Sequence, residues 1–138
     1  MHLLQRQLPG PRIDALAVVV TAISIAALSA CAAAQVADAR AATRIVTDAT
    51  IDFSHGQHHI YEYYGVDGVS RAGDGVGERR VIGHWKVRPD GTVCFLHDDP
   101  NQSGCVFVRM NRGQIEFHRI DGVVEGPFAL ERGNPHGL

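Results

Sequence analysis

The sequence predicts an all-β domain: an antiparallel meander of six or seven short strands that forms a bent sheet or a small open barrel and carries one disulfide. Three observations predict this fold. Turn signals recur about every ten residues between β-branched and aromatic runs. No segment of the exported chain has the apolar spacing of an amphipathic helix. Two cysteines, Cys94 and Cys105, lie on neighbouring predicted strands.

Residues 1–31 form a predicted lipoprotein signal peptide. Residues 15–30 (ALAVVVTAISIAALSA) are apolar, and this run is shorter than the roughly 20 residues that a membrane-spanning helix needs. It ends in Leu28-Ser29-Ala30-Cys31, which resembles the lipobox of bacterial lipoproteins, whose cysteine is lipidated and becomes the new N-terminus. The alternative is ordinary secretion with cleavage after a small-residue triplet, residues 32–34 or 37–39.

Both alternatives export the chain. We expect it in the bacterial cell envelope, held to the outer membrane by a lipid on Cys31 and facing the periplasm, or alternatively soluble in the periplasm. Lipidation of Cys31 leaves an even pair of cysteines for an oxidising compartment. Cleavage removes Arg6, Arg12 and Asp14 from 13 basic and 15 acidic side chains. The remaining mild acidity argues against a nucleic-acid partner.

Four segments follow from composition: the signal peptide over residues 1–31, an alanine-rich tether over 32–43, the β domain over 44–132 and a flexible tail over 133–138. Within the domain, residues 45–53 predict either a short strand or a turn followed by a strand. Residues 59–65 (HIYEYYG) predict a second, because aromatic and polar side chains alternate there. Asp67-Gly68 turns the chain into residues 69–72, and a glycine-rich loop leads to a strand over 79–88.

The centre of the domain, residues 83–117, predicts three consecutive antiparallel pairings. Pro89-Asp90-Gly91 is a hairpin signal that places Trp85 opposite Cys94. The polar connection after His97 places Cys94 opposite Cys105, close enough for a disulfide. A three-residue turn at 111–113 pairs Phe107 with Phe117. The cysteine pair lacks C-x-x-C spacing, which favours a structural bridge over a redox couple.

This register predicts a core on one face of the sheet, with Trp85 against the disulfide. The predicted core comprises Val81, Trp85, Val87, Cys94, Leu96, Cys105, Phe107, Ile115 and Phe117. The opposite face is half polar. The last strand, residues 123–130, is interrupted by Pro127, which an edge strand tolerates.

Two groups of residues are candidate sites. His55, His58 and His59 lie within five residues and predict a zinc or copper site, against the alternative of solvated histidines; otherwise no cofactor is expected. The second group is a binding face for an envelope protein or a small ligand, made of Tyr61, Tyr63, His84, Phe95 and His118. No nucleophile with an adjacent base is recognisable, so no catalytic residue is assigned and we expect no enzyme.

The succession Tyr61…Tyr64, Asp67-Gly68, Gly83-His84-Trp85, Asp90-Gly91…Cys94 and Gly104-Cys105…Gly113 resembles a family of small exported proteobacterial proteins known only as a domain of unknown function. The resemblance covers residues 45–130. It implies an exported β domain and assigns no activity.

A weaker resemblance, based on the signal, a tryptophan after glycine and one disulfide, is to periplasmic metalloprotease inhibitors and related outer-membrane lipoproteins. It implies that residues 32–43 enter a protease cleft. Lipocalins share the G-x-W pattern near their start, but the 53 residues after Trp85 are too few for a full lipocalin barrel. The expected function is therefore a non-enzymatic envelope lipoprotein that binds a ligand or protein, with protease inhibition and histidine-based metal binding as alternatives.

Overall fold

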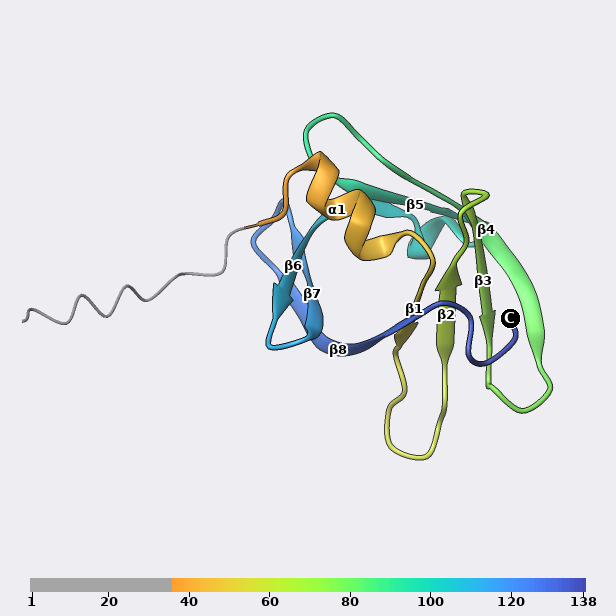
Figure 1. Cartoon of the computed structure of the whole chain (residues 1–138). Helices are drawn as coiled ribbons and strands as arrows, with labels where there is room; N and C mark the ends of the chain where they lie inside the picture. Colours follow the sequence, from red (N-terminus) through yellow and green to blue (C-terminus); the bar gives the residue numbers. More distant parts are fainter. Residues whose placement is uncertain (1–35) are drawn as a thin grey trace, which may run out of the picture. The chain divides into compact units, whose positions relative to one another are not determined.

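The computed structural model describes residues 36–138; the predicted signal peptide and Cys31 lie outside the described residues. The chain forms a short helix followed by an antiparallel meander (Figure 1). The elements are α1 (Ala39–Val46), β1 (Ala49–Asp52), β2 (Tyr61–Tyr64), β3 (Val69–Gly73), β4 (Arg79–Val87), β5 (Val93–His97), the 3-10 helix η1 (Pro100–Gln102), β6 (Gly104–Asn111), β7 (Gln114–Arg119) and β8 (Val124–Arg132).

Eight strands close into a barrel, so the all-β antiparallel fold is confirmed, whereas a count of six or seven strands in a bent or open sheet is wrong. Closure depends on β1, which pairs with β2 on one side and with β8 on the other. Ala49 pairs with both Tyr64 and Arg132, and Asp52 with both Tyr61 and Ala129. The 53 residues after Trp85 are too few to form the whole barrel. The strands β1, β2 and β3, which precede the strand that carries Trp85, form the remaining part.

The helix α1 replaces part of the expected tether. Asp38 caps it by accepting a hydrogen bond from the backbone N–H of Ala41 at 2.7 Å. Ala42 and Val46, spaced i and i+4, lie on one face of the helix and are fully buried. The folded domain therefore begins before Arg44, and residues 39–43 belong to it. No helix in residues 36–138 has the length and apolar character that crossing a bilayer requires.

The disulfide Cys94–Cys105 is confirmed, with the two residues directly opposite each other on β5 and β6. The other two predicted registers are each wrong by one residue. Trp85 lies opposite Phe95, because the β4–β5 connection contains five residues between Val87 and Val93. Asn111 pairs with Gln114, because Arg112 and Gly113 form a two-residue turn in which both φ angles are positive, 51° and 84°.

A β-bulge in β4 places both Ile82 and Trp85 inside the barrel. Ser70 pairs with Gly83 and Arg71 with Val81, so Ile82 is an extra residue on β4. Gly83 has φ 148°, and a Cβ there would collide with the carbonyl oxygen of Leu96. A strictly alternating strand could not bury residues three apart on one face.

The shifted registers change the predicted core. Leu96 and Val81 are 52% and 57% exposed, whereas Phe95 is buried in the barrel. Because Val93 and Phe95 point inward, Cys94 between them lies on the outer face, so Trp85 does not pack against the disulfide. The buried cluster comprises Ala42, Val46, Ile51, Tyr64, Trp85, Val93, Phe95, Val108, Ile115 and Phe117.

One end of the barrel is closed. The indole Nε1 of Trp85 donates to the carbonyl oxygen of Gly65 at 3.0 Å, and its backbone N–H donates to Gly68 at 2.9 Å. Tyr64 meets the indole edge-on, with ring centroids 6.3 Å apart. The buried face of α1 packs against this cluster. In Figure 1 the helix lies in the upper part of the domain, and the β1–β2 connection extends from the bottom. The closed end thus carries the tight turns, and the longer loops gather at the other.

The C-terminal residues 133–138, expected to be a flexible tail, form hydrogen bonds with the barrel and with each other. The N–H of Gly133 donates to the carbonyl of Asp48 at 2.8 Å, and the hydroxyl of Thr50 donates to the carbonyl of Gly133 at 2.7 Å. The Asn134 carboxamide bonds both backbone groups of Leu138. This segment packs on the outside of the barrel.

Candidate functional site

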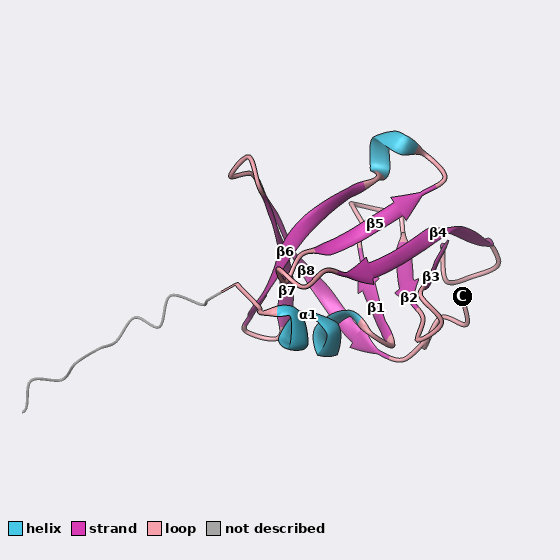
Figure 2. Cartoon of the chain, turned by 90° about the horizontal axis from the view of Figure 1, so that it is seen from above, coloured by secondary structure: helices cyan, strands magenta, loops and turns pink. Residues whose placement is uncertain are grey.

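The open end of the barrel contains a cavity of about 820 Å³, which we call the cup. It lies opposite α1, among the loops that join β1 to β2, β5 to β6 and β7 to β8; Figure 2 shows η1 on the second of these loops. The residues lining it are Phe53, Ile60, Glu62, Tyr64, Ala72, Arg80, Ile82, Phe95, His97, Asn101, Gln102, Ser103, Gly104, Cys105, Val106, Phe117, Arg119, Ile120, Asp121 and Glu125.

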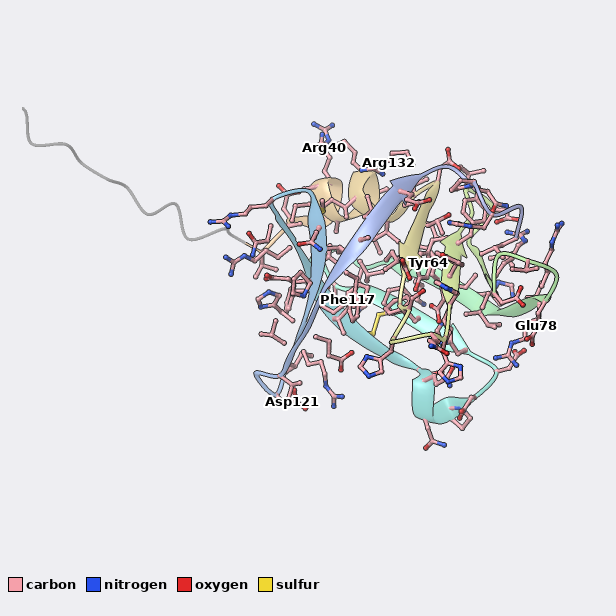
Figure 3. The ribbon with its side chains drawn as sticks, turned by 90° about the horizontal axis from the view of Figure 1, so that it is seen from below. Arg40, Tyr64, Glu78, Phe117, Asp121 and Arg132 are labelled. Atoms are coloured by element: carbon pink, nitrogen blue, oxygen red, sulfur yellow. A yellow bond between two sulfur atoms is a disulfide. The ribbon has the colours of Figure 1, made fainter. Side chains whose placement is uncertain are left out.

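Four aromatic rings lie next to one another along the inner wall of the cup. Tyr64 and Phe95 have ring centroids 5.2 Å apart, Phe95 and Phe117 are 5.8 Å apart, and Phe117 and Phe53 are 6.0 Å apart. These rings come from β2, β5, β7 and the end of β1, which only the closed barrel brings together. Tyr64 and Phe117 are labelled within the barrel in Figure 3. The wall therefore offers ring faces and edges to a bound molecule.

A carboxylate lies among these rings. Alternation along β2 turns Glu62 and Tyr64 inward. The Tyr64 hydroxyl donates to Oε2 of Glu62 at 2.6 Å, and Tyr64 is 1% exposed. Burial raises the pKa of Tyr64 well above its ordinary value, and the neighbouring Glu62 charge raises it further. The tyrosine hence keeps its proton and remains a donor to Glu62 at any ordinary pH.

His97 contributes a second polar group to the cup. Its backbone is fixed by Ser103, since the His97 N–H donates to the Ser103 hydroxyl at 2.9 Å and that hydroxyl donates to the His97 carbonyl at 3.1 Å. Both ring nitrogens are buried, and neither has a hydrogen-bond partner among residues 36–138. A ligand with a donor or an acceptor at this height of the wall would supply the missing partner.

The rim of the cup carries both signs of charge. The Arg119 guanidinium lies 2.9 Å from Asp121 and 3.6 Å from Glu125, within the β7–β8 hairpin whose tip, with Asp121, is labelled in Figure 3. The backbone N–H of Val123 and the Arg119 guanidinium lower the pKa of Asp121. Arg80 is exposed at the mouth and belongs to none of the ion pairs in the described residues. Three carboxylates and two guanidiniums thus line the cup.

The five residues of the predicted binding face do not lie together. Of these, Phe95 alone lines the cup. The ring of Tyr61 stacks on that of His136, with centroids 3.7 Å apart. The Tyr63 hydroxyl donates to Oδ1 of Asp48 at 2.8 Å. On the outside of β7, Nε2 of His118 lies 3.1 Å from Oε2 of Glu116. His84 is exposed on the outer side of β4. The predicted face assumed an open sheet and registers that differ by one residue from those observed. The observed registers and the closure of the barrel separate its residues.

The three candidate metal-binding histidines lie in the β1–β2 connection and are all exposed. His55 and His58 pair through their backbones, with N–H to carbonyl distances of 2.9 and 3.1 Å, and the His59 ring stacks near Tyr61 with centroids 6.2 Å apart. Within residues 36–138, no three His, Cys, Asp or Glu side chains are grouped to hold a metal ion.

Glu62, Arg80 and Arg119 are cup residues that the sequence reasoning did not select. The pattern Tyr61-Glu62-Tyr63-Tyr64 did carry a signal, since alternation places Glu62 on the same face as the buried Tyr64. Which of the two faces was the inner one depended on the closure of the barrel.

A scan of the chain against family models, a search of curated proteins and a search of solved structures each gave no match.

Proposed function

We propose that this protein is an exported, lipid-anchored binding protein without catalytic activity, which takes a small, largely apolar molecule into the cup. The observation that carries the proposal is a cavity of about 820 Å³, lined in part by four neighbouring aromatic side chains, at the open end of a closed barrel. Cavities of about 300 to 1,000 Å³ with apolar walls and a few polar groups are typical of small-molecule sites. Eight-stranded barrels have interiors wide enough for one such ligand.

The construction below the cup supports binding rather than mere packing. Trp85, Val93 and Val108 fill the closed half of the barrel, and α1 covers its end. Towards the open end, beyond Tyr64 and Phe117, the interior of the barrel is not filled by side chains and forms the cup. A floor held by the bond from Trp85 to Gly65 gives the cup a fixed depth, which reduces the entropy that a ligand must lose on binding.

Export is supported by the disulfide, because such bridges persist in oxidising compartments. The lipid anchor on Cys31 is proposed from the sequence motif. It would hold the domain at the periplasmic face of the outer membrane, with an apolar ligand or an envelope protein as its partner.

The proposed inhibitory use of residues 32–43 fits the structure less well. Residues 39–43 belong to α1, and the N–H of Ala37 donates to the carbonyl of Val108 at 2.9 Å. A protease inhibitor could insert only the residues before these. A chain that starts at Val36 retains α1 and its cap, and we expect it to bind cup ligands as the longer chain does.

A side chain added at Gly104 tests the proposal directly. Gly104 lies opposite the inward-facing Phe95, lines the cup, and has no other heavy atom within 4 Å of an added Cβ. Gly104→Phe should therefore fill the cup without displacing the backbone. We expect it to weaken binding of the fluorescent probe N-phenyl-1-naphthylamine at least about tenfold, which corresponds to roughly 1.4 kcal/mol.

The matched control is Gly77→Phe, in the exposed β3–β4 loop, where an added Cβ also meets no atom within 4 Å. It should bind the probe as the wild type does. Probe binding that is the same in both variants, with the disulfide formed and the barrel folded, would show that the cup is not the binding site. Absence of binding by the wild type would contradict the proposal itself.

A further inference from the structure

We infer that the cup selects ligands that carry a positively charged amine, held between the Glu62 carboxylate and the aromatic wall. This inference rests on the proposed function and adds the chemical class of the ligand.

The first step is the incomplete bonding of Glu62. Oε2 accepts one hydrogen bond, from Tyr64, and the other oxygen has no protein partner within residues 36–138. None of the ion pairs in that part of the chain includes Glu62. Its direct neighbours across the strands are Ile51 and Ala72, which are apolar. In the empty cup, water can solvate this oxygen.

A ligand that fills the cup changes this balance. It removes water from Glu62, and a carboxylate that loses water without gaining a partner is costly. The ligand must therefore return a hydrogen bond, and a charged donor returns the strongest one. A ligand carboxylate at this position would place two like charges together in an apolar setting, which is unfavourable. The negative charge of Glu62 in the wall of the cup thus favours an ammonium group.

The aromatic wall favours the same charge. Phe95 and Phe117 present ring faces or edges to the cavity on either side of a T-shaped contact, and Tyr64 and Phe53 continue the wall. Ring faces attract cations by their quadrupole, and the attraction grows where water is excluded. The arrangement resembles the aromatic sites that recognise alkylammonium groups, with Glu62 as the neutralising charge.

The arginines at the rim set the orientation. Arg119 is paired with Asp121 and Glu125 and has little charge left to offer. Arg80 has no such pair and lies across Ala72 from Glu62, two strands away. Because Arg80 is exposed at the mouth, it favours a neutral or anionic group at the outer end of a ligand. The amine therefore lies beside Glu62, and a neutral or anionic end of the ligand lies beside Arg80.

Three probes of similar size and different charge test this selection: 1-naphthylmethylamine, 1-naphthylmethanol and 1-naphthoate, titrated by calorimetry at neutral pH. We expect the amine to bind about tenfold more tightly than the alcohol, because a hydrogen bond to a charged group contributes about 1.5 to 3 kcal/mol, and we expect the naphthoate to bind least. Glu62→Gln should remove about this tenfold preference while changing alcohol affinity less than about threefold.

Glu78→Gln is the matched control, since it makes the same change of charge on the β3–β4 loop, away from the cup (Figure 3). It should leave all three affinities unchanged. Tighter binding of naphthoate than of the amine, or an equal loss for amine and alcohol in Glu62→Gln, would overturn the inference. The wild-type comparison alone decides it if the variant does not fold.

These outcomes separate the inference from the proposed function. If all three probes bind the wild type equally and Gly104→Phe prevents it, the cup is a binding site without charge selection, and only the inference fails. If no probe of any charge binds, the proposed function fails with it.

Discussion

At the scale of single residues, two buried aromatic side chains with polar ends define the interior. Trp85 donates across 20 residues to Gly65, and Tyr64 donates to Glu62. Each partner satisfies a polar atom that would otherwise be costly inside an apolar barrel. The first bond lies at the end of the barrel that α1 covers, and the second holds the Glu62 carboxylate in place within the cup. A hydrogen bond from a buried aromatic side chain thus stabilises the closed end of the barrel in one case and positions a residue of the cup in the other.

Asp67 provides a residue-scale prediction about acid stability. The Arg71 guanidinium donates to Asp67 at 2.6 Å, and with the backbone N–H of Val69 it lowers the pKa of Asp67 to about 2. A folded-state pKa below the ordinary value near 4 stabilises the fold above about pH 4, and this contribution is lost as the pH falls towards 2. We expect Asp67→Asn to reduce the change in urea midpoint between pH 5 and pH 2.

The control for this measurement is Asp98→Asn, at an exposed position two residues before η1, where the carboxylate forms no hydrogen bond or ion pair within residues 36–138. It should leave the dependence of the urea midpoint on pH close to that of the wild type. An Asp67→Asn curve that parallels the wild type throughout this range would show that the Arg71 pair contributes nothing to folding.

At the scale of elements, the sequence predicted strands and turns better than it predicted their lengths. Asp90-Gly91 and the turn before Gln114 were placed correctly, but whether a loop holds two, three or five residues cannot be read from its turn residues, and each miscount shifted a register. The register of β5 and β6 was predicted correctly, because the polar connection after His97 places Cys94 opposite Cys105. The bulge at Ile82 and the short helix α1, with only Ala42 and Val46 buried, left no periodic signal strong enough to read.

The disulfide joins the two strands with the shortest ladder. β5 and β6 share three residue pairs, whereas every other neighbouring pair of strands shares at least four. The Cys94–Cys105 bridge spans a sequence separation of 11. Replacing both cysteines by serine should lower the free energy of unfolding by about 3 kcal/mol in the chain-entropy account. Urea denaturation of the double variant measures this loss.

Hydrogen exchange measures where the stability is lost. In the Cys94→Ser, Cys105→Ser variant we expect the amides that bond across the three-pair β5–β6 ladder to gain more exchange than those that bond across the six-pair β6–β7 ladder. Uniform acceleration over all strands would instead mean that the bridge acts only through the unfolded chain. A double variant as stable as the wild type would contradict both accounts.

At the scale of the whole molecule, the closure of the sheet into a barrel is the property that could not be predicted from the sequence. β8 pairs with β7 near its start and with β1 near its end, and Ala129 pairs with both Gln114 and Asp52. A register shift between Ile115 and Phe117 accompanies this change of direction. Closure removes both exposed edges of the sheet. It also creates the cup, whose wall joins strands from opposite ends of the chain, so the site could not be assembled before the fold was known.

The position of Asp38 bears on where the predicted signal peptide would be cleaved. Cleavage after residues 37–39, one of the alternatives to lipidation, would remove Asp38, whose side chain caps α1, and the Ala37 N–H that bonds Val108. Loss of such a cap costs about 1 kcal/mol. Cleavage before Cys31 leaves both intact.

We therefore expect the chain, expressed with its own signal in a bacterial host fed radiolabelled palmitate, to be labelled and to begin at Cys31. Cys31→Ser should abolish the label, and globomycin, which blocks the lipoprotein signal peptidase, should make the wild-type precursor accumulate. The control is that Cys94 and Cys105 remain oxidised in the Cys31→Ser protein, because the apolar signal still directs export. Wild-type protein that is unlabelled and begins after residue 34 would contradict the lipid anchor and support the alternative of a soluble periplasmic protein. The proposals about the barrel and its cup would not be affected.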